Sequence, residues 1–217
     1  MTVRIVLDKA DPKLTARPIF QCLQGFFLIA GILVLSYAAY TYAARFAFQS
    51  LESWKFDRGQ ARSGGRSAPD TGPNIGPEPV LRFAIPRLRI AAMVREGIDG
   101  RTLNLAIGHI PSTALPGRPG NVGLAAHRDT LFRGLKDVRP DDEITLSTLN
   151  REYTYRVVWY KVVKPTAVDV LKPIAGEETL TLVTCYPFYF VGNAPDRFVV
   201  RARRVYHHPS VLTPALY

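Results

Sequence analysis

The sequence predicts a mainly β domain, a small barrel or sandwich, preceded by one N-terminal membrane-spanning helix. Three observations lead to this prediction: a charge-free apolar run near the N-terminus, a Gly- and Pro-rich stretch after it, and a series of short β-type runs beyond residue 80. Many short strands separated by Pro, Gly and Asp are typical of small barrels and sandwiches. A chain of 217 residues has room for one such domain and a terminal appendage.

The composition excludes some classes of protein. The chain is 47% hydrophobic and 21% charged, which is typical of a globular protein and not of a disordered one. Its 28 basic and 18 acidic residues give a net charge of +10. No basic run is interleaved with aromatic residues as in a nucleic-acid groove, so we expect no nucleic-acid partner. An anionic cell surface suits this charge equally well.

The apolar run extends from Pro18 to Ala44 without one charged side chain. It is longer than the roughly 20 residues that a helix needs to cross the hydrocarbon core. Tyrosines cluster toward its C-terminal end, where amphipathic rings favour the membrane interface. A cleaved signal peptide and a buried core helix are the alternatives, but the run exceeds the roughly 7–15 apolar residues of a signal peptide and no strict Ala-x-Ala site follows it. We therefore expect an uncleaved anchor.

Basic residues before this run predict a cytoplasmic N-terminus and a folded domain outside the cytoplasm. They are Arg4, Lys9, Lys13 and Arg17. The predicted organisation has five parts: a cytoplasmic segment at 1–17, a transmembrane helix at 18–45, a juxtamembrane segment and linker at 46–79, a folded domain at 80–206 and a tail at 207–217. Within the juxtamembrane part, residues 51–58 are compatible with a prolonged helix, and Gly, Pro and Ser dominate from Gly59 to Pro79.

The folded domain is predicted from short runs rich in Val, Ile, Thr, Tyr and Phe. Strands are expected at 80–85, 88–94, 121–126, 143–146, 153–163, 179–185 and 198–205, and short helices at 102–107, 131–135 and 168–171. Side chains alternate along a strand, so the large apolar residues of each run share one face, which we expect to line the core. His127, Cys185 and Arg197 fall on the opposite, less apolar face, which predicts a site on the outer wall of the domain.

Cys185 is the candidate nucleophile. Cys22 begins the apolar run, so a membrane would separate the two thiols, and we interpret Cys22 as helix filler. Proteins outside the cytosol usually pair their cysteines, so a lone Cys185 there is either reactive or a buried structural residue, and the residue pattern leaves both interpretations open. Thiol attack requires the thiolate, and because an ordinary cysteine has a pKa of about 8.5, a nearby acid/base group or cation is needed.

His127 is the preferred partner among four histidines, because it ends a predicted strand. His109 lies beside a Pro-rich turn, where we expect a structural hydrogen bond, and His207 and His208 lie in the tail. Apart from that adjacent tail pair, no Cys or His residues have the spacing of metal ligands, so no metal is expected. The acidic run 141–143 is interpreted as a solvated turn and gives no support for calcium.

Arg197 is the candidate cation. It begins the strand after the Cys185 loop, so a two-strand hairpin would place its guanidinium beside the thiol. A guanidinium in that place can donate two hydrogen bonds to a developing oxyanion. Arg128 is its main rival.

These motifs, taken together and in this order, resemble the sortase family. Thr181 to Cys185 reads Thr-Leu-Val-Thr-Cys, which resembles the family's strand ending in Thr-Leu-x-Thr-Cys, and Arg197 follows it before a β-rich stretch. Gly120 to Arg128 looks like the family's histidine segment, which commonly ends Ala-Gly-His-Arg; here Ala126 replaces the glycine. The segments at 109–117 and 185–189 look most like class D.

The resemblance implies an eight-stranded sortase barrel, no cofactor, and a groove that binds a sorting signal of the Leu-Pro-x-Thr-Gly kind. Cys185 would attack the Thr carbonyl to give a thioacyl enzyme, His127 would act as general acid and base, and Arg197 would stabilise the oxyanion or position the substrate. The groove candidates are Thr184, Tyr186 and Ala126. The resemblance also implies a location in a bacterial cell membrane. The implied partners are secreted proteins with a sorting signal and an amine on the cell wall, a pilin or another surface group. A hydrolytic cysteine peptidase and a non-catalytic, membrane-tethered peptide-binding domain are the rival functions.

Overall fold

The computed structural model describes residues 12–63 and 81–206. Contacts divide the chain into two units, Met1–Ala44 and Arg45–Tyr217. The predicted cytoplasmic segment up to residue 11, the linker from 64 to 80 and the tail from 207 lie outside the described residues.

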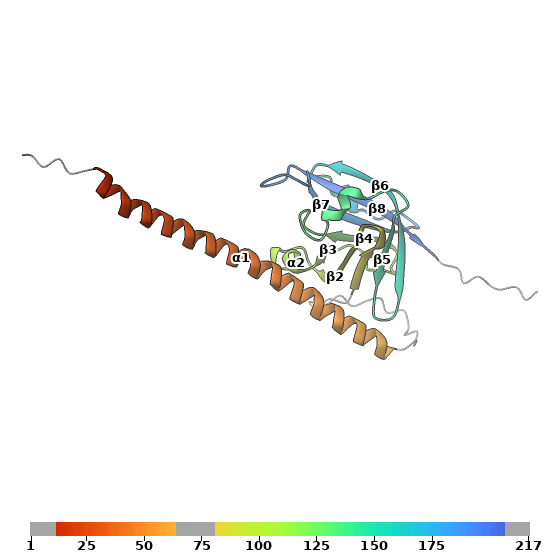
Figure 1. The fold of residues 1–217 in the computed structure, drawn as a ribbon. Coiled ribbons are helices and arrows are strands. Elements are labelled where there is room, and N and C mark those ends of the chain that lie inside the picture. Colours follow the sequence, from red (N-terminus) through yellow and green to blue (C-terminus); the bar gives the residue numbers. More distant parts are fainter. Residues whose placement is uncertain (1–11, 64–80, 207–217) are drawn as a thin grey trace, which may run out of the picture. The chain divides into compact units, whose positions relative to one another are not determined.

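One long helix, α1 (Pro12–Ser63), contains the predicted membrane-spanning segment (Figure 1). In the first unit its apolar side chains are exposed, as at Leu28 and Leu35. Phe20–Arg62 has a mean hydropathy of 2.0 in its most apolar window, so among the described helices it is the one long and apolar enough to cross a membrane. The limits 18–45 stay a prediction.

The helix continues further than its composition indicated. Residues 59–63, predicted as the start of a Gly/Pro-rich linker, form its last turn, since the Gln-Ala-Arg that follows Gly59 has good helix propensity. From Arg45 onward the helix belongs to the second unit, where Phe56 is buried. In that unit the Gln49 side chain donates to the carbonyl of Leu105 (2.7 Å) and accepts from the amide of Met93 (2.8 Å).

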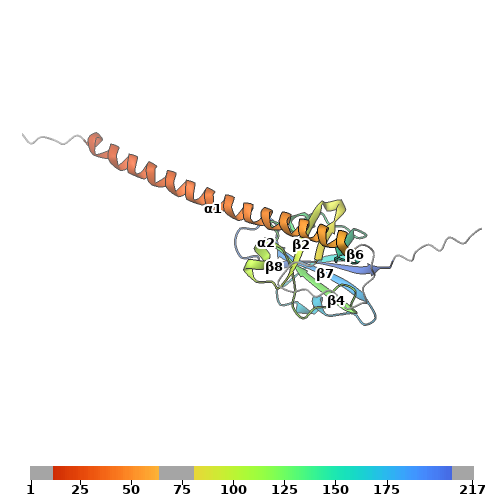
Figure 2. The same ribbon diagram turned by 90° about the horizontal axis from the view of Figure 1, so that it is seen from below.

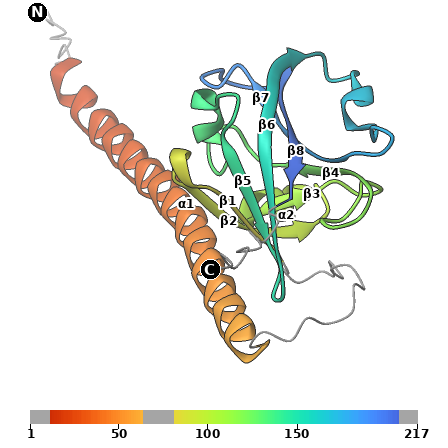
Figure 3. The same cartoon turned by 90° about the vertical axis from the view of Figure 1, so that its right-hand side faces the viewer.

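The described strands of the second unit close into an eight-stranded barrel, which confirms the predicted fold class (Figures 1 and 3). They are β1 (Leu81–Ile85), β2 (Ile90–Glu96), β3 (Ile107–His109), β4 (Gly120–Ala125), β5 (Glu143–Ser147), β6 (Glu152–Val163), β7 (Glu178–Tyr186) and β8 (Asp196–Val205). Their order around the barrel is β1-β2-β3-β4-β7-β8-β6-β5, and β5 pairs with β1 to close it. Two pairs, β2–β3 and β4–β7, are parallel, and the others are antiparallel.

Short helices lie in the connections. They are η1 (Pro86–Leu88), α2 (Gly100–Leu105), η2 (Arg133–Asp137) and η3 (Val168–Leu171). The last three were predicted within two residues of their positions. Strand β3 was missed, because three residues give no periodicity to detect.

The predicted alternation is confirmed inside the barrel. Val122 and Leu124 of β4 and Leu180 and Leu182 of β7 lie in the hydrophobic core. Burying such side chains supplies most of the driving force for folding. The strands that carry the candidate site are therefore fixed from the inside by their apolar faces.

The solvated turn predicted for 141–143 is wrong at its middle residue. Asp142 is buried, forms an ion pair with Arg87 and accepts a hydrogen bond from the amide of Arg139 (2.8 Å). The hydrogen bond from Arg87 lowers the pKa of Asp142, although burial opposes it. This carboxylate joins η1 to the turn before β5, and the sequence alone did not indicate its distant partner.

Candidate functional site

Strands β4 and β7 are parallel neighbours in the barrel (Figure 2), and their pairing places His127 beside Cys185. The paired register ends at Ala125 opposite Val183. Beyond it, the amide of Ala126 donates to the carbonyl of Val183 (3.3 Å), so the two chains stay adjacent for a further residue. The next step along both strands brings His127 and Cys185 to neighbouring positions at the same end of the barrel.

The antiparallel pairing of β7 and β8 places Arg197 directly opposite Cys185. Side chains opposite each other in such a pair have Cβ atoms about 4.5–5.5 Å apart. The guanidinium donates through Nη1 to the carbonyls of Ala194 (3.2 Å) and Asp196 (2.9 Å). Within the described part of the chain no carboxylate pairs with it, and a guanidinium has five donors, so N–H groups remain for a substrate oxygen.

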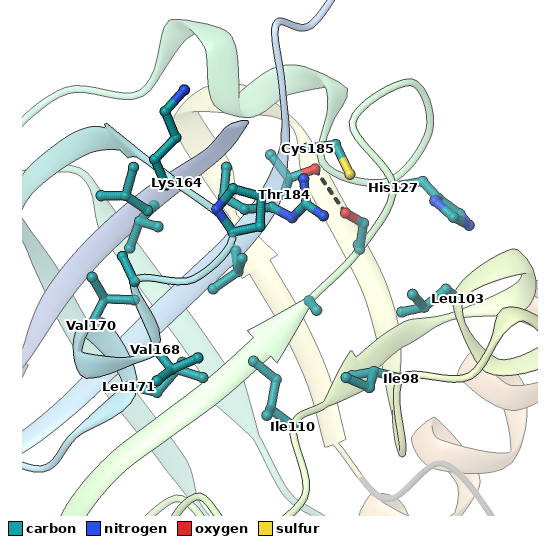
Figure 4. Close-up of a pocket in the computed structure, with 18 residues that line it drawn as sticks. Ile98, Leu103, Ile110, His127, Lys164, Val168, Val170, Leu171, Thr184 and Cys185 are labelled. Atoms are coloured by element: carbon teal, nitrogen blue, oxygen red, sulfur yellow. Dashed lines mark hydrogen bonds between the residues drawn. The ribbon is translucent and has the colours of Figure 1, made fainter. Parts of the chain in front are cut away.

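Cys185, His127 and Arg197 line one pocket of about 370 Å³ (Figure 4). Its walls are mainly apolar. Ile98 and Leu103, between β2 and β3, form one side of it in Figure 4, and Val168 and Leu171 of η3 form the other. Such a pocket suits an aliphatic group, and the three polar side chains that line it are the groups able to act on a bound molecule.

The outer face on which the site was predicted is partly covered. By strand alternation, Cys185 and Arg197 lie on the faces of β7 and β8 that point away from the barrel core, His127 follows the end of β4, and all three are half-buried. Thr179 and Thr181 of β7 are 1% and 0% exposed. The connection between β6 and β7, which carries η3, covers them: Thr181 Oγ1 lies 3.5 Å from the carbonyl oxygen of Val170.

Two of the three groove candidates line this pocket and one does not. Ala126 and Thr184 line it, and the Thr184 hydroxyl donates to the carbonyl of Ala126 (2.8 Å; Figure 4). Tyr186 is not among the lining residues. Its ring stacks on Phe198 and meets Phe188 edge-on, where it packs against the core.

The rival residues have other partners. His109 is buried, with Nδ1 2.6 Å from a Glu96 carboxylate oxygen and Nε2 near the Thr113 hydroxyl (3.0 Å), which is the structural role expected for it. Arg128 donates through Nη2 to the carbonyl of Phe190 (2.6 Å) in the connection between β7 and β8. His207 and His208 lie outside the described residues. Of the residues that the structure describes, no three His, Cys, Asp or Glu side chains form a group that could hold a metal ion.

Sequence reasoning missed the apolar walls and Lys164. Lys164 lines the pocket, and its Nζ lies 2.8 Å from an Asp196 oxygen. The wall residues lie in connections whose apolar side chains show no strand periodicity. The one available signal was the apolar turn at 168–171, which was predicted as a helix but not as part of a site.

Comparisons with known proteins identify one family. The family model described as "Sortase domain" matches residues 83–205. The chain is 32% identical to Sortase D of Bacillus subtilis (strain 168) over 157 residues, which cover 72% of this chain and 77% of that protein.

Solved sortase structures have the same fold. A Clostridium perfringens Sortase D5 transpeptidase matches with a TM-score of 0.60 over 75% of this chain and 99% of the other, at 24% identity, which shows the fold alone. Sortase C-1 from Actinomyces oris matches with a TM-score of 0.56 over 70% of this chain and 99% of the other, at 27% identity.

Proposed function

The chain belongs to the sortase family, and on that premise we propose that it is a membrane-anchored cysteine transpeptidase that acts on a sorting signal of the Leu-Pro-x-Thr-Gly kind. It would join the cleaved protein to an amine at the cell surface. One observation carries the proposal: Cys185, His127 and Arg197 come from three strand ends and line a single, mainly apolar pocket. Sortases as a family are cysteine transpeptidases, so the class of reaction follows from membership; the signal, the intermediate and the residue roles are proposed.

The first half-reaction forms a thioacyl enzyme. The Cys185 thiolate attacks the Thr carbonyl carbon, and a new S–C bond forms while the carbonyl electrons move to oxygen. The tetrahedral intermediate then collapses and the C–N bond breaks, with the His127 imidazolium giving its proton to the departing amine. An aliphatic side chain of the signal would occupy the pocket between the α2 side and η3.

The second half-reaction releases the product. The incoming amine loses a proton to the neutral His127 imidazole and attacks the thioester carbon, and the C–S bond breaks to restore the Cys185 thiolate. Arg197 would donate to the oxyanion in both steps, since its position opposite Cys185 directs it to the same carbonyl. Losing one such donor typically costs about 10²–10³-fold in kcat.

The apolar helix α1 supports a membrane anchor. With basic residues before the apolar run, the N-terminus would lie in the cytoplasm and the barrel outside it. There the barrel would meet secreted proteins that carry the signal and acceptor amines on the wall, a pilin or another surface group. The limits proposed for the parts remain those predicted: 1–17, 18–45, 46–79, 80–206 and 207–217.

A transpeptidation assay tests the proposal. The full chain, in detergent micelles, is incubated with a small library of fluorogenic Leu-Pro-x-Thr-Gly peptides and increasing concentrations of triglycine, and the products are separated by mass spectrometry. We expect the ligated product to rise with triglycine at the expense of hydrolysed peptide. The Cys185→Ala variant, checked for folding by circular dichroism, should give neither product.

Two outcomes would contradict the proposal. Hydrolysed peptide alone at every triglycine concentration would indicate a peptidase. Peptide binding without turnover, equal in the wild type and in Cys185→Ala, would indicate a non-catalytic binding domain in which the thiol is structural.

A further inference from the structure

A buried polar network lies on the outer face of β4, β7 and β8, beneath η3. We call it the outer-face network, and its members are Asn121, Thr179, Thr181 and Arg201. Each of these residues is at most 6% exposed. Burying a polar group lowers the stability of the fold unless the group forms a hydrogen bond, so each of these side chains needs partners within the protein.

Asn121 is at the centre of the network. Its Oδ1 accepts from the hydroxyls of Thr179 (3.0 Å) and Thr181 (2.8 Å), which fixes the orientation of the amide. Its Nδ2 therefore points the other way and donates to the carbonyl of Leu171 (2.9 Å). One side chain of β4 thus holds the last residue of η3.

Arg201 supplies the second attachment to η3. Its Nη1 donates to Asn121 Oδ1 (3.2 Å) and to the Thr179 hydroxyl (3.0 Å), and its Nη2 donates to the carbonyl of Val170. Among the described residues no carboxylate forms an ion pair with this buried guanidinium. Burial lowers the pKa of Arg201, although Glu177 opposes the shift. The charge is therefore offset by Glu177 and by the oxygen atoms to which Arg201 donates. One of these oxygens is the Val170 carbonyl of η3, and another belongs to Asn121, which itself donates to the Leu171 carbonyl of η3.

A contribution to stability does not by itself explain why a charged residue, Arg201, is buried at this position. An apolar side chain of similar volume at a buried charged position is often as stable as the charge, or more so. What a guanidinium adds here is a rigid fork of donors that sets the positions of the groups it binds. Val170 and Leu171, whose carbonyls the network holds, also line the pocket that contains Cys185.

We propose that Arg201, together with Asn121, is a positioning residue: it fixes the η3 wall of the pocket and thereby sets the affinity for the substrate side chain bound there. The substrate named in this inference rests on the proposed function. The attachment of η3 by Arg201 and Asn121 does not. It goes beyond the three catalytic candidates, because Arg201 acts on the substrate only through η3.

The test compares Arg201→Met with Arg203→Met in the full chain. Arg203 is the matched control: it lies two residues along β8, on the same face, but is exposed and pairs with Glu177 at 3.0 Å. With the most active fluorogenic Leu-Pro-x-Thr-Gly peptide as probe, Arg201→Met should raise KM about tenfold and leave kcat within about threefold, as expected when binding shared by ground and transition states is lost. Arg203→Met should change KM less than about twofold, because a surface ion pair contributes little.

Hydrogen exchange gives a second readout. The amides of Val170 and Lys172 donate to the carbonyls of Ala167 and Asp169 around η3. Their exchange should accelerate about tenfold in Arg201→Met and stay unchanged in Arg203→Met. Local opening of η3 needs less free energy once the hydrogen bond from Arg201 to η3 is lost. Arg201→Lys, which keeps one donor for Val170, should restore part of both effects.

A second variant covers the case in which Arg201→Met does not fold. Asn121→Asp keeps the shape and the acceptor for Arg201 but replaces the donor to Leu171 with an oxygen, so it should raise KM and exchange at η3 in the same way. The inference is overturned if folded Arg201→Met, or Asn121→Asp, matches Arg203→Met in both KM and exchange. If the wild-type protein turns over no peptide, the proposed function fails, and the exchange comparison alone still decides whether the network holds η3.

Discussion

Replacing Gly123 with alanine tests how closely the outer face of β4 is covered. A Cβ at this position would lie 2.9 Å from Thr113 Cγ2 and 3.2 Å from both Ile110 Cβ and Ile110 Cδ1. The segment cannot simply move away, because the Gly123 amide donates to the Thr113 hydroxyl (3.0 Å) and the Ile110 amide donates to the Gly123 carbonyl (2.8 Å). The added methyl must therefore displace packed atoms.

The expected loss of stability follows from two opposing effects. Overpacking a filled site costs about 1–3 kcal/mol, and the smaller conformational freedom of alanine in the unfolded chain returns about 0.4–1 kcal/mol. We expect Gly123→Ala to be less stable by about 1–2 kcal/mol. Since Ile110 lines the pocket, KM for the peptide should also rise.

Urea unfolding at constant m-value measures this difference. Gly100→Ala is the control, because a Cβ there meets nothing within 4 Å and the residue begins α2. That variant should be unchanged or more stable by up to about 1 kcal/mol. A Gly123→Ala protein as stable as the wild type would refute the close packing described for this face.

Three further predictions concern the core, the buried carboxylate and the loop after β7. Leu182→Ala, at a fully buried position of β7, should lower the free energy of unfolding by about 2–5 kcal/mol in urea titrations; a smaller loss would mean that the barrel interior is loosely packed. Asp142→Asn should destabilise the protein at pH 7, because Arg87 lowers the pKa of Asp142 and the pair therefore stabilises the fold only while the carboxylate is charged. The gap from the wild type should shrink as the pH falls through and below about 4, and thermal melts that keep the gap constant would contradict the pairing. Arg128→Met removes the donor to the Phe190 carbonyl and should speed chymotrypsin cleavage of that exposed loop about fivefold, with little change in melting temperature; unchanged cleavage would show that Arg128 does not hold the loop.

Much of the barrel was predictable because its strands carry their own local signal. Leu180 and Leu182 alternate with threonines, and that period of two specifies both the strand and the face that enters the core. Strand β3 carries no such signal, since Ile107 to His109 is too short to show a period. The order of strands was not predictable from periodicity either, because the pairing of β6 with β8 joins segments that no turn connects directly.

The candidate site was partly predictable for the same reason. Arg197 opposite Cys185 follows from a hairpin between neighbouring strands. His127 reaches Cys185 only through the parallel pairing of β4 and β7, which local pattern does not reveal. The covering of the outer face by η3 depends on contacts such as that of Arg201 with the Val170 carbonyl, and nothing near Arg201 in the sequence indicates that partner.

The roles proposed for Cys185, His127 and Arg197 are tested most directly by intact-protein mass spectrometry. The full chain is exposed briefly to a Leu-Pro-x-Thr-Gly peptide without added amine. We expect one adduct with the mass of the acyl fragment, located on Cys185, sensitive to hydroxylamine and absent in Cys185→Ala. His127→Ala and Arg197→Ala should each form it at least about 100-fold more slowly. No adduct in the wild type under conditions where the peptide is cleaved, or an adduct that forms equally fast in both variants, would contradict the roles assigned to these three residues.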